Sequence, residues 1–187
     1  MDMKERIKQQ SILLFERKGF SETSIQDIVE SLGVTKGTFY YYFNSKEQLL
    51  MAIHLGYIDD LLQRQEGILK QTVASRIKLE GIIELLIRDI EQYGPSGRVF
   101  FREMRHLAVE NADEVKRKRE QFRTNIEHLI RDGIKEGEFR QGIQPDIIAF
   151  TILGVTNWSY QWFNPAGEIS ADLLSSIYSD VILNGIV

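Results

Sequence analysis

The spacing of apolar residues in the first fifty positions predicts three short helices. Apolar side chains recur at helical spacing over residues 7–15, 25–32 and 35–43. Gly33 stands between the second and third runs, where a glycine can adopt the left-handed conformation that ends a helix. The pattern therefore predicts a helix-turn-helix, with a third helix packed against it.

The second helix of this motif presents outward residues that suit a phosphate backbone. Lys36 supplies a cation, Gly37 allows close approach of peptide N–H groups, and Tyr40 and Tyr41 supply two phenols. Thr23 is open to two interpretations, a helix cap or a phosphate contact. The candidate DNA-binding residues are Thr23, Ser24, Thr35, Lys36, Gly37, Thr38, Tyr40, Tyr41 and Lys46.

Two motifs carry a family resemblance, TSIQDIVESLG from Thr23 and VTKGTFYYYFNSKEQLL from Val34. Together with the preceding Gly19-Phe20 they resemble the DNA-binding domain of the TetR family of bacterial repressors. The resemblance covers about the first quarter of the chain by motif. It implies a DNA-binding domain over residues 1–46, a ligand-binding and dimerisation domain over residues 47–187, and a phosphate contact at Lys46.

The rest of the chain is also predicted to be helical. A fourth helix is capped by Asn44 or Ser45 and continues past residue 60. Further helical runs cover residues 67–93, 98–107, 115–136 and 145–163, and a last run begins at Ser170 or Asp172. Gly94-Pro95 is expected to break the chain between the first two of these runs. With no strand pattern of any length, the fold class is all-α with about nine helices.

The last two helices are apolar around much of their circumference, in IIAFTILGVTNWSYQW and LLSSIYSDVILNGIV. One core rarely needs that much apolar surface at its end, so the pattern favours a homodimer. The alternative is that all of this surface is intramolecular core. A two-fold dimer would match a palindromic operator in double-stranded DNA.

A repressor of this kind needs an effector, and aromatic residues of the middle helices are candidate pocket walls. The segment GVTNWSYQWFNPAGEIS, from Gly154, resembles TetR family members that respond to acyl-CoA thioesters. Three arginines recur at helical spacing and suit the phosphates of such a ligand, although they could equally form a solvated face paired with Glu103 or Glu110. The candidate ligand-binding residues are Arg98, Phe101, Arg102, Met104, Arg105, Phe122, Trp158 and Trp162.

Composition sets limits on these hypotheses. The net charge is −4, and residues 1–54 carry as many acidic as basic side chains, so DNA affinity has to come from local contacts and from two copies binding together. There is no cysteine and no apolar run of membrane-spanning length. We therefore expect a soluble, cytoplasmic protein with no membrane partner.

An enzyme is the hypothesis from another class. His54, His106 and His128 are the only histidines, and none has a partner at metal-ligand spacing. No nucleophile elbow, P-loop or dinucleotide motif is present. We therefore expect no catalysis, no cofactor and no metal site. A multidrug-responsive repressor of an efflux system is an alternative use of the same aromatic residues.

Overall fold

The computed structural model describes residues 2–187, except for the side chains of Glu110 and Asn111. The described residues form eight α-helices and one 3₁₀ helix and contain no strand, which confirms the all-α prediction. The elements are α1 Met3–Lys18, α2 Ile25–Leu32, α3 Lys36–Tyr42, α4 Lys46–Leu69, α5 Ser75–Arg102, η1 Met104–His106, α6 Val109–Lys135, α7 Pro145–Trp162 and α8 Ala171–Ile186. Among the described residues, no helix combines the length and the hydropathy that a bilayer crossing requires.

The chain divides into two compact units, each made of two chain segments. The N-terminal unit contains the residues up to Asp59 together with Pro95–Lys116. The C-terminal unit contains Asp60–Gly94 and Arg117–Val187. Helices α4, α5 and α6 each contribute residues to both units, so the domain boundary predicted after residue 46 stays a prediction.

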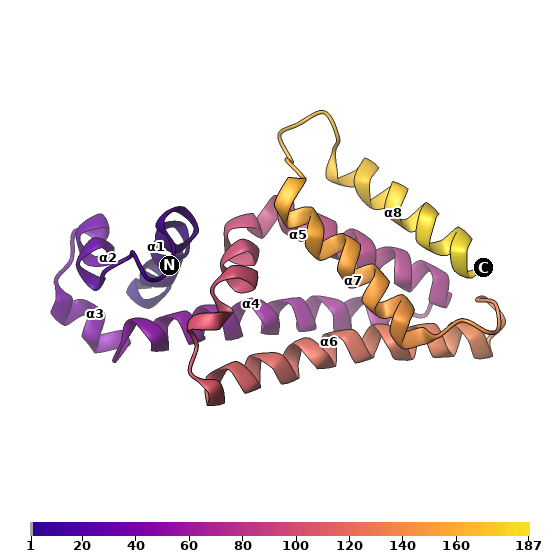
Figure 1. The fold of residues 1–187 in the computed structure, drawn as a ribbon, viewed down its shortest axis with the longest axis horizontal. Helices are drawn as coiled ribbons and strands as arrows, with labels where there is room; N and C mark the ends of the chain where they lie inside the picture. Colours follow the sequence, from indigo (N-terminus) through magenta and orange to yellow (C-terminus); the bar gives the residue numbers. More distant parts are fainter. Residues whose placement is uncertain (1) are drawn as a thin grey trace. The chain divides into compact units, whose positions relative to one another are not determined.

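The first three helices of the N-terminal unit lie close together (Figure 1) and bury aromatic and aliphatic side chains. Phe15 of α1, Ile28 of α2 and Phe39 of α3 are all fully buried, as their helical spacing predicts. The start of α4 adds Leu49 and Leu50 to the buried set. The predicted helix-turn-helix is therefore present, with α2 and α3 as its two helices.

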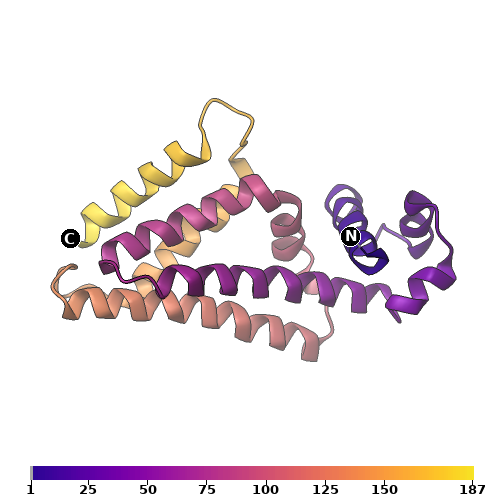
Figure 2. The ribbon, with the colours of Figure 1, turned by 180° about the vertical axis from the view of Figure 1, so that it is seen from behind.

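The C-terminal unit has a branched aliphatic core with a few buried polar groups. Ile82, Ile83 and Ile87 of α5 are fully buried. The far half of α4 runs beside α6 (Figure 2), and the two helices are linked where the Gln65 amide donates to the Phe122 carbonyl at 2.9 Å. Gln65 is itself fully buried, so this bond satisfies a polar group inside the core.

Two helix boundaries differ from the sequence prediction. The predicted break at Gly94-Pro95 is a kink, because Tyr93 leaves helical geometry (φ −130°, ψ 23°) while α5 continues to Arg102. Pro95 lies just after the kink, where its missing N–H and fixed φ are tolerated as at a helix start. Helix α6 begins at Val109 and not at Val115, and the helix predicted over residues 98–107 is divided between α5 and η1.

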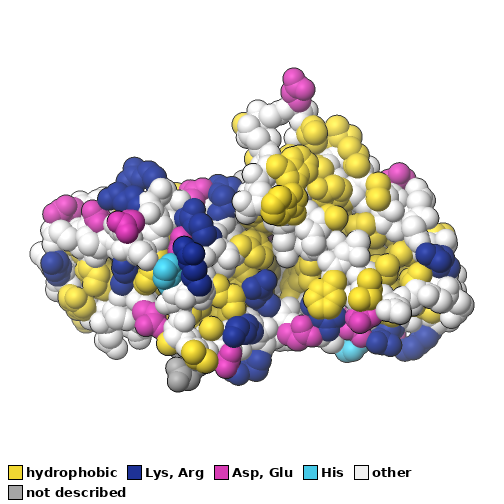
Figure 3. All heavy atoms as spheres, viewed as in Figure 1, with side chains coloured by type: hydrophobic (Ala, Val, Ile, Leu, Met, Phe, Trp, Pro, Cys, Tyr) yellow, Lys and Arg dark blue, Asp and Glu magenta, His cyan; other side chains and the backbone are white. Residues whose placement is uncertain are grey.

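Helices α7 and α8 expose a group of large apolar side chains, visible as hydrophobic surface over these two helices in Figure 3. We call this group the α7–α8 apolar face. Trp158 is 68% exposed and Val181 is 67% exposed, although both are apolar. The face consists of Ile147, Phe150, Trp158, Trp162, Leu173, Ile177 and Val181. A group of exposed large apolar side chains is a candidate interaction surface.

Candidate functional site

The start of α2 is fixed by a reciprocal set of hydrogen bonds. The Asp27 N–H donates to the Ser24 hydroxyl at 3.0 Å, and the Ser24 N–H donates to Asp27 Oδ2 at 2.8 Å. This is a capping box, which satisfies two N–H groups that a helix start leaves without partners. Gly33 ends α2 in the left-handed region (φ 67°), and its N–H donates to the Val29 and Glu30 carbonyls.

Helix α3 presents the outward surface that the sequence predicted. Tyr41 is 81% exposed and Tyr40 is 51% exposed, whereas Phe39 is fully buried. Lys36 and Gly37 are exposed at the start of the helix. The helix is capped by Thr35, whose hydroxyl accepts from the Thr38 N–H at 3.3 Å. Helix α3 therefore exposes a cation at its N-terminal end and two phenols in its second half.

Thr23 occupies an interior position. Its side chain is fully buried, and its hydroxyl donates to the Gly19 carbonyl at 2.8 Å. The cap of α2 comes from Ser24 instead. This placement argues against a DNA contact by the Thr23 side chain and gives it a structural role in the α1–α2 loop.

Lys46 lies at the start of α4 and binds the same loop. Its ammonium donates to the carbonyls of Phe20 and Thr23, both at 2.7 Å, and lies 4.3 Å from the centre of the Phe20 ring. Burial lowers the pKa of Lys46. The ammonium therefore holds the loop before α2, a function that the sequence pattern did not reveal.

We expect the capping box to fail in acid. Hydrogen bonds from the Ser24 hydroxyl and N–H, together with one from Lys18, lower the pKa of Asp27 to about 2. Because the folded pKa lies below the unfolded value, the stabilisation is present above the ordinary aspartate range and is lost as pH falls towards 2. A carboxyl NMR titration of Asp27 tests this, and Asp27→Asn should remove the corresponding acid-dependent exchange of the Ser24 amide. An ordinary aspartate titration would contradict the prediction.

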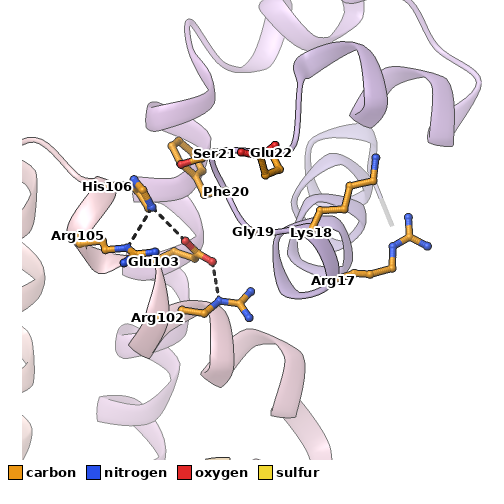
Figure 4. A pocket seen from close by; sticks show the side chains of 10 residues that line it. All are labelled: Arg17, Lys18, Gly19, Phe20, Ser21, Glu22, Arg102, Glu103, Arg105 and His106. Atoms are coloured by element: carbon orange, nitrogen blue, oxygen red, sulfur yellow. Dashed lines mark hydrogen bonds and ion pairs between the residues drawn. The ribbon is translucent and has the colours of Figure 1, made fainter.

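Two of the three predicted ligand-binding arginines pair within the N-terminal unit (Figure 4 shows Arg102). Arg98 forms an ion pair with Glu16 at 2.6 Å. Arg102 Nε donates to Glu103 at 2.7 Å, and its Nη2 donates to the Phe15 and Glu16 carbonyls. These contacts agree with the alternative of paired charges, and they hold the end of α5 against α1.

The aromatic part of the predicted ligand set is divided between the two units. Phe101 and Met104 lie half-buried in the N-terminal unit. Phe122 is buried in the C-terminal unit, where Trp158 and Trp162 belong to the α7–α8 apolar face. Neither unit by itself contains the whole predicted set.

Sequence reasoning missed a polar network inside the C-terminal unit. Asp89 of α5 is 1% exposed, pairs with Arg64 of α4 and accepts a 2.7 Å hydrogen bond from the Tyr160 hydroxyl of α7. The Arg64 guanidinium also lies 5.0 Å from the centre of the Tyr93 ring, at the kink of α5. A signal was present, because Asp89 stands seven residues after Ile82 and therefore on the apolar side of its helix.

The described residues hold no cluster of histidine, cysteine or carboxylate side chains suited to a metal ion. The geometry instead combines a helix-turn-helix, an exposed α3 and a helical C-terminal unit. These features define a DNA-binding transcriptional regulator of the helix-turn-helix class.

Comparisons with known proteins identify the family. The model described as "Bacterial regulatory proteins, tetR family" matches residues 10–53, and "Tetracyclin repressor-like, C-terminal domain" matches residues 73–186. The chain belongs to the TetR family of transcriptional regulators. The family consists of regulators and not enzymes, which confirms that expectation.

Three similar proteins illustrate the relationship. The HTH-type transcriptional repressor KstR2 of Rhodococcus jostii is 28% identical over 175 residues, covering 92% of this chain and 85% of the relative. The structure of the ketosteroid transcriptional regulator KstR2 of Mycobacterium tuberculosis gives a TM-score of 0.91 at 24% identity, covering 100% of this chain and 95% of the other. AibR, solved with isovaleryl coenzyme A and operator DNA, gives 0.86 at 21% identity, covering 96% and 97%.

Proposed function

We propose that this regulator is a dimeric repressor that binds a palindromic operator and that a small apolar ligand, an acyl-CoA, modulates its DNA binding. The observation that carries the proposal is the pairing of two surfaces on one chain. Helix α3 exposes Lys36, Tyr40 and Tyr41, and α7 and α8 expose an apolar face. A two-fold dimer through that face would present two copies of α3 to two half-sites.

The DNA contacts are proposed for the accessible members of the predicted set. Lys36, Gly37, Tyr40 and Tyr41 are exposed on α3, and Ser24 and Thr35 are exposed at the two helix starts. Thr38 is half-buried and bonded to Thr35, so we assign it to the support of α3. Phosphate contacts by Lys36 would carry no sequence information, whereas Tyr40 and Tyr41 can reach base edges.

Lys36 and Lys46 are expected to respond differently to substitution. Lys36→Ala should weaken operator and unrelated DNA alike and lower the salt-dependence slope by about 0.9 per lost phosphate contact. Lys46→Met should leave that slope nearly unchanged and reduce thermal stability, because carbonyls of the α1–α2 loop lose their donor. Fluorescence anisotropy over a range of salt concentrations, with thermal unfolding in parallel, measures both effects. A lower salt-dependence slope of DNA binding for Lys46→Met would instead indicate that Lys46 contacts a phosphate.

The acyl-CoA proposal rests on the sequence of α7 and on similarity to AibR, whose structure contains isovaleryl coenzyme A. Trp158, Trp162 and Phe122 remain candidate ligand contacts in the C-terminal unit. Phe101 and Met104 remain candidates in the N-terminal unit. Of the three predicted arginines, Arg98 and Arg102 form ion pairs with carboxylates. Arg105 forms none with the described residues, so it is the candidate for phosphate recognition. The efflux alternative is less favoured, because the descriptions of the three similar proteins mention a ketosteroid regulator and a coenzyme A thioester and do not mention efflux.

Intrinsic fluorescence tests the ligand directly, because Trp158 and Trp162 are the only tryptophans. We expect saturable quenching by a long-chain acyl-CoA and not by free fatty acid, free CoA or a cationic dye. Sedimentation of the same samples shows whether the signal follows ligand or a change in oligomeric state, and Trp158→Phe and Trp162→Phe separate the two reporters. A response to the dye alone would favour the efflux alternative.

A further inference from the structure

A row of interacting charged side chains links the end of α5 to η1 and lies against the α1–α2 loop. Figure 4 shows that Arg102 contacts Glu103, that Glu103 contacts His106 and that His106 contacts Arg105, through ion pairs and hydrogen bonds. Glu103 is 2% exposed, so its carboxylate depends on these partners. All four residues belong to the N-terminal unit, which also contains the helix-turn-helix.

His106 Nε2 has two neighbours that require opposite protonation states of this nitrogen. His106 Nε2 lies 3.4 Å from Glu103 Oε2 and 3.3 Å from Arg105 Nε. A protonated nitrogen can donate to the Glu103 carboxylate and cannot accept from Arg105. An unprotonated nitrogen can accept from Arg105 and cannot donate to Glu103. The proton on Nε2 therefore selects the partner. A neutral ring can hold its single proton on Nε2 or on Nδ1, and only the cationic ring always carries a proton on Nε2.

The imidazole ring of His106 contacts the loop that leads into α2. The centre of the imidazole lies 5.2 Å from the centre of the Phe20 ring. The Phe20 ring also contacts Phe15, with the two ring centres 5.3 Å apart. The Lys46 ammonium lies 4.3 Å from the same Phe20 ring and binds the Phe20 carbonyl. Phe20 thus connects η1, α1 and α4 immediately before the capping box of α2.

We propose that His106 is a positioning residue for the helix-turn-helix and that its protonation makes operator binding pH-dependent. The proposal rests on the DNA binding proposed above. A cationic His106 ring forms an ion pair with the buried Glu103 carboxylate, which the neutral ring cannot form. The protonated state therefore holds η1, and with it Phe20, more firmly.

Several other charged groups lie near His106. Arg17, Lys18 and Glu22 line the same pocket of about 370 Å³, while Lys46 lies across the Phe20 ring. Lys18 is already paired with Asp27, and Arg102 with Glu103. The charged groups in direct contact with the His106 ring are Glu103 and Arg105. A proton also adds positive charge to the unit that carries α3, which favours DNA binding.

Operator affinity measured between about pH 6 and pH 8, at constant ionic strength, tests the proposal because histidine changes charge there. In the unmodified protein we expect about fivefold tighter binding at the lower pH, which corresponds to about 1 kcal/mol and is smaller than the full strength of one charge-assisted hydrogen bond. His106→Gln should remove most of this dependence. His128→Gln is the matched control, because His128 is an exposed histidine of α6 in the C-terminal unit, and it should keep the full dependence.

A second variant and a direct measurement distinguish protonation of His106 from a general loss of structure in the variant. Glu103→Gln keeps His106 and its contact with Phe20 but removes the carboxylate, so the pH dependence should shrink while operator binding at the higher pH remains. Long-range ¹H–¹⁵N NMR of the free protein reports the proton on Nε2 without DNA. An unchanged pH profile in His106→Gln, or a ring that keeps one charge state over this range, overturns the proposal. Absence of operator binding at every pH would instead overturn the proposed function.

Discussion

Val181→Asp is expected to convert the proposed dimer into monomers and to lower operator affinity by about a hundredfold or more, the usual gain from joining two binding modules. Val181 is 67% exposed on α8, within the α7–α8 apolar face. In a monomer the aspartate would remain in water and cost little. In a dimer it would place a charge in an apolar interface with no partner, which is strongly unfavourable.

A matched substitution separates this effect from a general one. Val109→Asp makes the same chemical change at a residue that is 72% exposed at the start of α6, outside the apolar face. It should leave both oligomeric state and operator affinity unchanged, since an acidic residue is tolerated at a helix start. Sedimentation velocity and operator binding measure the two variants. A Val181→Asp protein that sediments as the parent does would remove the face from the dimer interface.

The helix-turn-helix could be predicted from the sequence because its signals are local. Ser24 and Asp27 are three residues apart, and their capping box depends on that spacing alone. Gly33 ends α2 through its own backbone conformation. The buried and exposed residues of α3 likewise follow from helical periodicity, which places Phe39 in the core and Tyr41 on the surface.

The arginines of α5 could not be assigned in the same way. Their spacing showed that Arg98 and Arg102 share a helix face, but a periodic pattern does not show what the face meets. Arg98 pairs with Glu16, and Arg102 binds the Phe15 carbonyl, both more than eighty residues earlier in the chain. The kink at Tyr93 was also hidden, because Pro95 is compatible with either a helix break or a new first turn.

Asp89→Ala is expected to destabilise the protein by about 3–5 kcal/mol, the cost of breaking a buried ion pair by removing one partner. Asp89 is 1% exposed and connects Arg64 of α4 with the Tyr160 hydroxyl of α7. Its removal leaves Arg64, whose side chain is 26% exposed, paired only with the half-exposed Asp60 among the described residues. Arg64 Nε already has no hydrogen-bond partner among them. The Tyr160 hydroxyl loses its acceptor as well, so three helices lose a common link.

Two further variants divide that cost between charge and hydrogen bond. Tyr160→Phe removes only the hydroxyl and should cost about 1 kcal/mol. Asp113→Ala removes an exposed aspartate that pairs with Lys116, and should cost less than about 1 kcal/mol because solvent screens such pairs. Urea unfolding at one fixed protomer concentration gives all three values, since dimerisation makes apparent stability concentration-dependent. If Asp89→Ala and Asp113→Ala cost the same, Asp89 contributes no more than a surface charge, and the network does not hold α4, α5 and α7 together.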